Sequence, residues 1–251
     1  MSIKGKHVAV LVHNYFEQSE FEEPIGALKD AGAEVTVISA DKTDLTGMQH
    51  VEMGDSFEAD LLLNQATPED YDALILPGGT INADNLRVIE EAKEWVIDFL
   101  NQEKPLAVIC HAPWVLASAD VLEGRRLTSY HTIRDDLINA GGDWVDQPVV
   151  IDGSLITSRR PEDLPQFNNQ IIKMLEAQKD SVLRTGAENL VSATEVANEE
   201  DLRLKTLGYL REEDEINDSD EGEILEDEEL SDSSELQPSH HGHVEEYGDS
   251  Y

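Results

Sequence analysis

The chain of 251 residues contains only one cysteine, Cys110. A single cysteine excludes an internal disulfide and a multi-cysteine zinc site, and it is typical of a reducing compartment. Basic residues are also scarce, because 18 Lys and Arg stand against 54 Asp and Glu, giving a formal net charge of -36. Such a charge is repelled by nucleic acid and by anionic membrane surfaces, so neither is expected as a partner.

Long apolar runs and metal-binding patterns are missing as well. No stretch approaches the roughly 18 to 20 apolar residues of a membrane span, and Met1 to Lys6 lead into a strand-like segment rather than a signal peptide. The histidines show no metal-ligand spacing in the body of the chain, and His240, His241 and His243 are more typical of a solvated tail than of a metal site. We expect a cytoplasmic protein without metal or other cofactor.

The acidic charge divides the chain in two. Residues 1–179 carry 31 acidic and 14 basic side chains, whereas residues 180–251 carry 23 acidic and 4 basic ones in far fewer positions. Runs such as Glu226-Asp227-Glu228-Glu229 cannot bury enough apolar surface to offset the entropy of ordering the chain. The sequence therefore predicts one globular catalytic domain over residues 1–179 and an acidic, largely disordered tail over residues 180–251.

Strand-like and helix-like segments alternate through the first part of the chain. This order predicts an α/β fold, in which a mostly parallel, flavodoxin-like sheet is sandwiched by helices. The strand-like segments are residues 7–12, 34–39, 72–76, 105–109, 149–151 and 155–157, and the helix-like segments are residues 20–31, 86–102, 112–119, 133–140 and 164–177.

Ligands in such folds bind at the carboxyl ends of the strands, near a switch in strand order. The loops after residues 12, 76 and 109 should therefore meet at one edge of the sheet. That arrangement brings together Glu17, Gly79 and Cys110.

Cys110 lies between an apolar strand and a short helix with Pro113 near its first turn. A helix N-terminus favours the thiolate, which is the nucleophilic form, so we predict a lowered pKa for this thiol. The adjacent His111 is a candidate general base or acid. The alternative is that a lone cysteine is simply a small buried apolar residue.

Two further groups have a chemical role available at this edge. The carboxyl of Glu17 can hydrogen-bond the Cys110 sulfur, or it can be one surface charge among many. The backbone N–H groups of Gly79 and His111 are candidate donors to an oxyanion, and the Gly78-Gly79 pair also suits a tight turn.

Four stretches around these residues form a recognisable set, namely Phe16-Glu17-Gln18-Ser19-Glu20, Leu74-Ile75-Leu76-Pro77-Gly78-Gly79, Ala107-Val108-Ile109-Cys110-His111-Ala112-Pro113 and Thr157-Ser158-Arg159-Arg160-Pro161. Together they resemble the PfpI family of intracellular proteases and protein deglycases. The resemblance covers about residues 4–178 in one register and leaves out the acidic tail. It implies a fold like that of class I glutamine amidotransferases, a nucleophilic cysteine followed by histidine, and a homodimer or homohexamer.

By position, the resemblance implies Cys110 as the nucleophile, His111 as its partner and Glu17 as the carboxylate bonded to the sulfur. In oligomeric relatives an acidic residue of the neighbouring subunit contacts the histidine, and Asp84 is the candidate here. His131 stands where many relatives have proline, and it is interpreted as lining the site, as capping the following helix or as a surface residue.

The resemblance implies a cysteine hydrolase that acts on small dicarbonyls or on glycated protein or nucleotide, as a deglycase or a glyoxalase-like stress-protection enzyme. Peptidase activity with the same nucleophile is an alternative, although it must expel a poor amine leaving group. A redox-sensing stress protein or chaperone that uses oxidation of Cys110 is an alternative of another class. A glutamine amidotransferase is disfavoured, because no Gly-Gln follows Cys110-His111 and no His-x-Glu is found downstream in the folded region.

Overall fold

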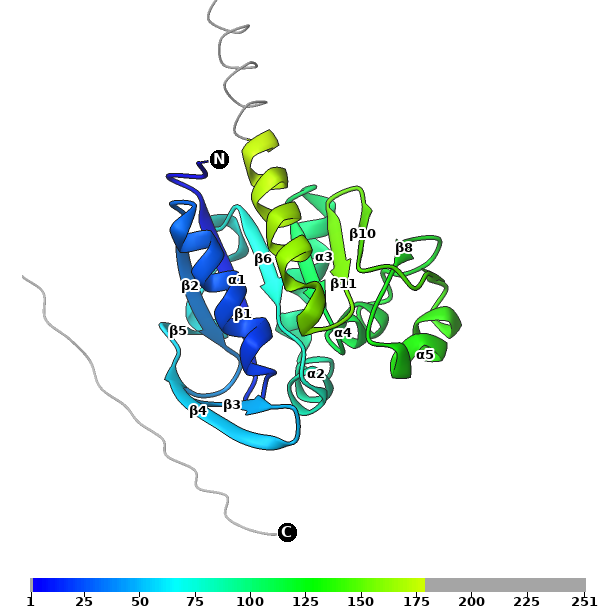
Figure 1. The fold of residues 1–251 in the computed structure, drawn as a ribbon, viewed down its shortest axis with the longest axis horizontal. Helices are drawn as coiled ribbons and strands as arrows, with labels where there is room; N and C mark the ends of the chain where they lie inside the picture. The colour runs from blue at the N-terminus through cyan, green and yellow to red at the C-terminus, as the bar shows by residue number, and fades with distance from the viewer. Residues whose placement is uncertain (1, 179–251) are drawn as a thin grey trace, which may run out of the picture. The chain divides into compact units, whose positions relative to one another are not determined.

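The computed structural model describes residues 2–178 (Figure 1). The predicted acidic tail and its histidines therefore lie outside the described residues. Among residues 2–178, no helix combines the length and apolarity that crossing a membrane requires.

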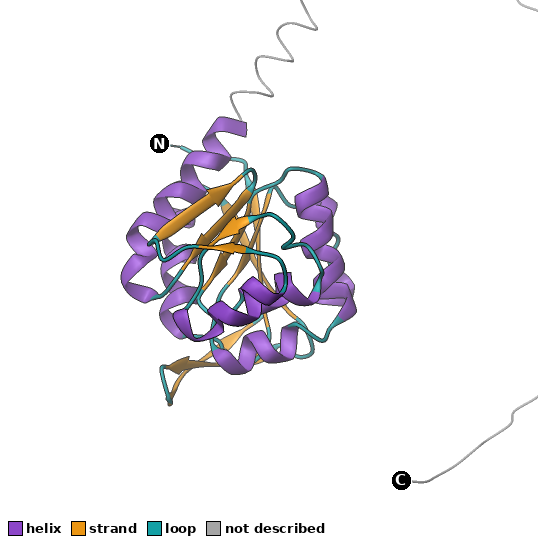
Figure 2. Ribbon diagram, turned by 90° about the vertical axis from the view of Figure 1, so that its right-hand side faces the viewer, coloured by secondary structure: helices purple, strands orange, loops and turns teal. Residues whose placement is uncertain are grey.

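A seven-stranded sheet forms the centre of the domain, with helices on both faces (Figures 1 and 2). All neighbouring strands are parallel except the edge strand β10, which pairs antiparallel with β11. This architecture confirms the predicted α/β fold. Across the sheet, the strands are β10 (Val149–Asp152), β11 (Leu155–Ser158), β7 (Leu106–Ile109), β6 (Ala73–Leu76), β1 (His7–Val12), β2 (Glu34–Ser39) and β5 (Leu61–Leu62).

The central strands are buried on both faces, which explains why they read as continuous apolar runs. Side chains alternate across a strand, so Leu74 and Leu76 of β6 pack in one hydrophobic cluster, whereas Ile75 packs in the other. The same alternation separates Val108 from Ile109 on β7. Each central strand therefore contributes to two cores at once.

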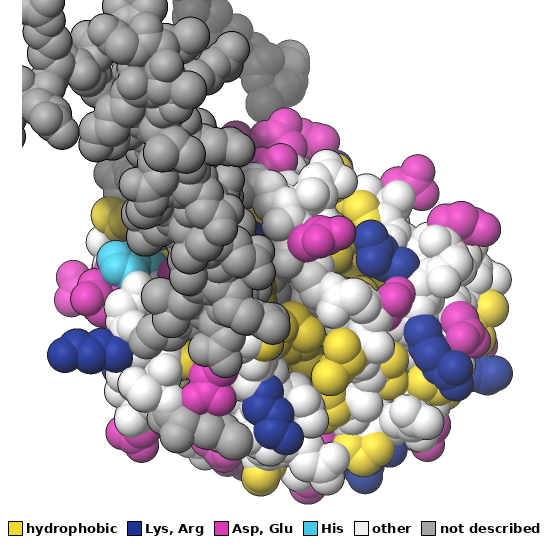
Figure 3. Space-filling model, turned by 90° about the horizontal axis from the view of Figure 1, so that it is seen from above, with side chains coloured by type: hydrophobic (Ala, Val, Ile, Leu, Met, Phe, Trp, Pro, Cys, Tyr) yellow, Lys and Arg dark blue, Asp and Glu magenta, His cyan; other side chains and the backbone are white. Residues whose placement is uncertain are grey.

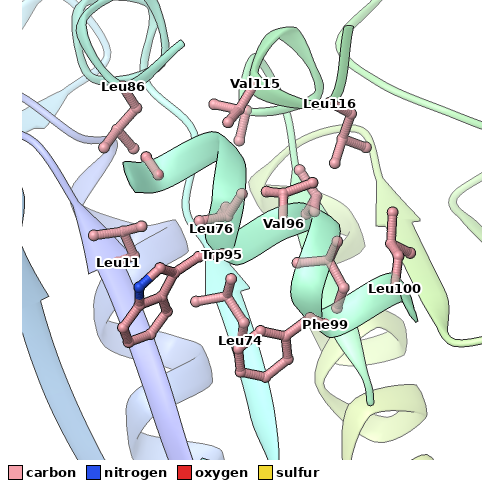
Figure 4. Packing of buried hydrophobic residues seen from close by; sticks show 14 of the residues in the cluster. Leu11, Leu74, Leu76, Leu86, Trp95, Val96, Phe99, Leu100, Val115 and Leu116 are labelled. Carbon is pink, nitrogen blue, oxygen red and sulfur yellow. The ribbon is translucent and has the colours of Figure 1, made fainter. Parts of the chain in front are cut away.

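One face of the sheet is covered by α3 (Glu90–Asn101). Its buried residues Trp95, Val96 and Phe99 recur at helical spacing and pack against Leu74 and neighbouring leucines (Figure 4). The same face carries α2 (Thr80–Leu86), α4 (Pro113–Ser118) and α5 (Arg134–Asn139). The opposite face is covered by α1 (Gln18–Asp30) and by residues 164–178, which are helical.

The predicted helix over residues 86–102 is wrong at its start. Leu86 ends α2, and α3 begins only at Glu90. Ile89, which precedes α3, has an extended backbone with φ -87° and ψ 119°, so the two helices cannot be continuous.

The sequence analysis assigned no element to the stretch that forms an antiparallel hairpin, β3 (Asp44–Gln49) and β4 (Glu52–Glu58). Strand β4 has no fully buried residue, so it lacks the apolar alternation that would mark a strand. Figure 2 shows the hairpin projecting from the body of the domain. Val51 at its turn is 90% exposed.

Charged groups of both signs are interspersed on the face seen from above the view of Figure 1 (Figure 3). The remaining short elements are β8 (Arg126–Leu127), β9 (Asp143–Trp144), η1 (Leu63–Gln65), η2 (Pro68–Asp70), η3 (His131–Ile133) and η4 (Pro161–Asp163).

The domain boundary can be tested by truncation. Leu164, Phe167, Ile171 and Leu175 complete the second hydrophobic cluster from residues 164–178. We therefore expect a chain that ends at Gln178 to unfold cooperatively, with a Tm within about 2 °C of the full chain in calorimetry.

A chain that ends at Arg160 is the matched control. It loses all four of these buried side chains, each worth roughly 1.5–3 kcal/mol, and should not fold. A Tm of the Gln178 chain that falls by 10 °C or more would place the boundary further along the sequence.

Candidate active site

Cys110 lies at the turn between β7 and α4, and its backbone is unusual. Its φ of 64° is in the left-handed region, which costs free energy for a residue other than glycine. The turn is held on both sides, because the Cys110 N–H donates to the Ser158 carbonyl at 3.1 Å and the Tyr130 N–H donates to the Cys110 carbonyl at 2.9 Å. Neighbouring backbone thus maintains the strained geometry that directs the thiol.

The sulfur of Cys110 is surrounded by polar groups although the residue is only 7% exposed. Nδ1 of His111 lies 3.2 Å from Sγ. The backbone N–H groups of Gly79 and His111 hydrogen-bond the sulfur. The structure thus brings the two predicted amide donors and the predicted histidine to one atom.

The carboxyl group at the sulfur belongs to Glu20, and the prediction of Glu17 for this contact is wrong. Glu20 hydrogen-bonds the Cys110 side chain, and its Oε2 accepts the Gly78 N–H at 2.9 Å. Glu17 precedes α1, and its carboxylate accepts the His50 N–H at 3.1 Å and the Ser19 hydroxyl at 3.3 Å.

The phase of α1 explains this correction. Glu20 lies on the same face as the buried Pro24 and Leu28, at positions i, i+4 and i+8, so its side chain points into the domain. That spacing is readable in the sequence and would have identified the buried carboxyl. Glu17 stands before α1 with an extended backbone, so its side chain does not follow the phase of the helix, and both carboxyl groups line the cavity.

Complete burial changes the acidity of Glu20. The pKa of Glu20 is raised from 4.5 to about 8, because loss of hydration and the negative charge of Glu17 outweigh the hydrogen bonds with Cys110 and Gly78 that lower it. Glu20 is therefore a neutral acid at pH 7. Its second oxygen, Oε1, has no hydrogen-bond partner among the described residues.

The predicted lowering of the Cys110 pKa is also wrong in direction. Burial raises the pKa of the thiol, a negative charge on Glu20 raises it further, and the amides of Gly79 and His111 only partly oppose these effects. The helix behind the sulfur, α4, has six residues, so its dipole is short. Because Glu20 is neutral at pH 7, its repulsion is absent there, and a base must still remove the thiol proton.

Among the groups at the sulfur, the His111 ring has a nitrogen that can accept that proton. Burial lowers its pKa, and the positive charge of a protonated His131 lowers it further, so the ring is neutral at pH 7. The ring stacks on Tyr130, with 4.9 Å between centroids, and meets Trp114 edge-on at 5.5 Å. Its second nitrogen, Nε2, lies 3.2 Å from the Thr132 hydroxyl.

The Gly78-Gly79 turn leaves no room for side chains. A Cβ added to Gly78 would collide with Glu20 and Cys110. Gly79 has a φ of 94°, and an added Cβ would lie 2.7 Å from the Glu17 nitrogen.

The turn is fixed by buried Asn82, whose Nδ2 donates to the carbonyls of Pro77 at 2.8 Å and Gly78 at 3.0 Å. The sequence analysis did not identify Asn82.

A cavity of about 420 Å³ opens above the sulfur. This volume suits a small organic substrate. The cavity is lined by Glu17, Glu20, His50, Val51, Gly79, Thr80, Cys110, His111, Tyr130, Thr132, Arg160, Pro161 and Glu162.

Two predicted residues lie outside this cavity. Asp84 is exposed on α2 and does not line the cavity of its own chain. His131 begins η3 without a side-chain cap, and its ring packs at 4.6 Å from Tyr130. His131 is exposed, which confirms the surface alternative, and it neither caps the following helix nor lines the cavity.

A metal site is not formed by the described part of the chain. Across residues 2–178, no three His, Cys, Asp or Glu side chains are grouped so as to hold a metal ion.

Comparison with known proteins gives a consistent set of relatives. The model of the DJ-1/PfpI family matches residues 6–174. The chain is 41% identical over 169 residues to a Pyrococcus furiosus protein named Deglycase PfpI, which covers 67% of this chain and 99% of the relative. It is 37% identical over 173 residues to the Putative cysteine protease YraA of Bacillus subtilis, covering 68% and 99%. The crystal structure of Drosophila melanogaster DJ-1beta superposes with a TM-score of 0.63 at 27% identity, covering 73% of this chain and 98% of that one.

The raised pKa of Glu20 predicts a pH dependence of stability. Between pH 4.5 and about 8 the unfolded chain releases this proton while the folded chain keeps it, so the free energy of unfolding falls as pH rises, by ~3 kcal/mol at pH 7. Glu20→Gln is neutral at every pH and removes this loss. The Tm of Glu20→Gln minus that of the unaltered protein should therefore rise from pH 4 to pH 8 in thermal melts.

Glu23→Gln is the matched control, because Glu23 is exposed three residues further along α1. Its Tm difference should stay flat over the same range. A flat difference for Glu20→Gln as well would mean that Glu20 ionises normally in the folded protein.

Proposed function

Because the chain belongs to the DJ-1/PfpI family, we propose that it is a cysteine-dependent hydrolase of the PfpI type that acts on dicarbonyl adducts. Its substrates are small dicarbonyls or early glycation adducts on protein or nucleotide amines and thiols. The observation that carries the proposal is the thiol of Cys110 at 3.2 Å from a neutral His111, beneath a cavity of about 420 Å³.

The groups around the sulfur suit nucleophilic catalysis. Nδ1 of His111 takes the thiol proton, and the sulfur attacks the aldehyde carbon of a small dicarbonyl, or the corresponding carbon of an adduct, whose amine or thiol leaves with the proton held by the imidazolium. The amides of Gly79 and His111 stabilise the negative charge that develops on the oxygen of that carbon. The proton on the same carbon then moves to the neighbouring ketone carbon, so that the first carbon is oxidised to a thioester as the second is reduced to an alcohol. Water cleaves the thioester, which releases a hydroxy acid and restores the thiol.

Neutral Glu20 supports the nucleophile without repelling it. A protonated carboxyl donates a hydrogen bond to the forming thiolate, whereas a carboxylate at the same place would oppose its formation. Its pKa of about 8 keeps the carboxyl protonated at pH 7.

Peptide hydrolysis is the second enzymatic candidate. The name of the Bacillus subtilis relative favours it, and the same Cys110–His111 pair would serve. The buried sulfur and the small cavity suit a short adduct better than an extended polypeptide.

A redox role is the candidate of another class. The two amides and the neutral carboxyl that surround Cys110 would also hydrogen-bond an oxidised sulfur. Mass spectrometry of Cys110 after mild peroxide, set beside turnover of methylglyoxal, separates the two classes. Rapid oxidation without turnover favours the redox role.

We expect Cys110→Ser to lower kcat/KM for methylglyoxal by about 1,000-fold or more, because a hydroxyl is a far weaker nucleophile than a thiol in this pocket. The assay is lactate formation, with folding checked by circular dichroism. Since the chain has one cysteine, alkylation of the unaltered protein should abolish the same activity. Full activity in Cys110→Ser would reject the hydrolase proposal.

We also propose a homodimer or homohexamer in which Asp84 of one subunit reaches His111 of another. Asp84 is exposed on α2 beside Ile81, an apolar residue that is 46% exposed, and Val88 just beyond the helix is 75% exposed. An exposed apolar pair around an acidic residue suits a subunit interface.

Light scattering at assay concentration should therefore give at least the mass of a dimer. Asp84→Asn should lower kcat/KM about tenfold, since it removes a charge from a neighbouring site, while Asp135→Asn on exposed α5 should not. An active monomer would remove Asp84 from the catalytic site.

A further inference from the structure

The two nitrogens of the His111 ring have different partners. Nδ1 lies 3.2 Å from the Cys110 sulfur, and Nε2 lies 3.2 Å from the Thr132 hydroxyl oxygen. We propose that Thr132 is a positioning residue, whose hydroxyl oxygen accepts the Nε2 proton of His111 and thereby leaves Nδ1 free to remove the Cys110 proton. This inference rests on the hydrolase proposed above, and it concerns the preparation of its nucleophile.

The position of the single proton on a neutral imidazole decides which of its nitrogens can act as a base. Such a ring carries one proton, so one nitrogen donates and the other accepts. If Nδ1 is to accept the thiol proton, the ring proton must be on Nε2, and Nε2 then needs an acceptor. The Thr132 oxygen has lone pairs for that bond, and its own hydrogen remains free to rotate toward the cavity.

Thr132 is exposed, and the backbone just before it is tied to the Cys110 turn. It lies in η3, and the Tyr130 N–H just before it donates to the Cys110 carbonyl at 2.9 Å. The Tyr130 ring also stacks on the His111 ring. The thiol, the imidazole and the hydroxyl are therefore connected within one chain by short backbone contacts.

A hydroxyl orients the ring without adding a charge to it. Within the chain, burial and the charge of His131 both lower the pKa of His111. The titratable groups that face the ring are Cys110, Tyr130 and His131 within the chain, and Asp84 of a neighbouring subunit in the oligomer proposed above. Thr132 therefore acts on the tautomer of the ring, whereas the neighbouring carboxylate acts on its charge.

The test compares Thr132→Val with Thr132→Ser in the full-length protein. Valine keeps the shape and removes the hydroxyl, whereas serine keeps the hydroxyl. Because Cys110 is the only cysteine, its alkylation by iodoacetamide reports directly on nucleophile formation, and no substrate is needed. The rate is measured from pH 5 to pH 9.

Thr132→Val should lower the alkylation rate at pH 7 about tenfold and move the midpoint of the pH profile, whereas Thr132→Ser should stay within about twofold. Thr128→Val is the matched control. Thr128 is buried four residues earlier, and its Oγ1 has no hydrogen-bond partner among the described residues, so its removal should leave the profile unchanged.

Nitrogen-15 NMR of the unaltered protein gives a second readout that does not depend on a variant folding. The His111 signals, assigned with His111→Gln, should show the proton on Nε2, and Thr132→Val should give a mixture of tautomers. A proton on Nδ1 in the unaltered protein, or equal alkylation profiles for the valine and serine variants, would overturn the proposal.

These readouts separate the inference from the proposed function. If the protein turns over no dicarbonyl while Thr132→Val still slows alkylation, the positioning role stands and the hydrolase proposal fails. If dicarbonyls are turned over and Thr132→Val alkylates normally, the hydrolase stands and the positioning role fails.

Discussion

The buried carboxyl of Glu20 connects the three turns that form the site. It lies in the first turn of α1, accepts the Gly78 N–H from the turn after β6, and hydrogen-bonds Cys110 after β7. Glycine is required at position 78 because any side chain there would collide with both Glu20 and Cys110. The position of the sulfur therefore depends on one carboxyl and on one residue without a side chain.

The environments of Glu20 and Cys110 lower the stability of the folded protein. Burying Glu20 without a cation raises its pKa to about 8, and the protein loses free energy of unfolding as the pH approaches neutrality. The positive φ of Cys110 adds a further local cost. The domain tolerates both losses of stability because the core on the two faces of the sheet, where β6 and β7 are fully buried, stabilises the fold. A rigid sheet can hold strained turns at its edge that an isolated loop would relax.

The environment of the sulfur explains why a helix dipole alone does not predict the pKa of Cys110. A strand-to-helix turn suggests a thiolate stabilised by a helix dipole, yet α4 is short and the sulfur is 7% exposed. Desolvation then outweighs the dipole, and the pKa of Cys110 rises. The neighbour that can accept the thiol proton is then the His111 ring at 3.2 Å, whose pKa is lowered, so that the ring is neutral at pH 7.

The sequence by itself determined the α/β order, the turns after residues 12, 76 and 109, and the pairing of Cys110 with His111, because these follow from local apolar periodicity and from adjacency in the chain. It missed the β3–β4 hairpin, whose strands carry little apolar pattern, and it chose Glu17 over Glu20. Only the tertiary structure decided which carboxyl meets the sulfur, which way the pKa of Cys110 shifts, and that Thr132 faces His111. Those outcomes depend on burial and on distances between separate turns, which no local pattern encodes.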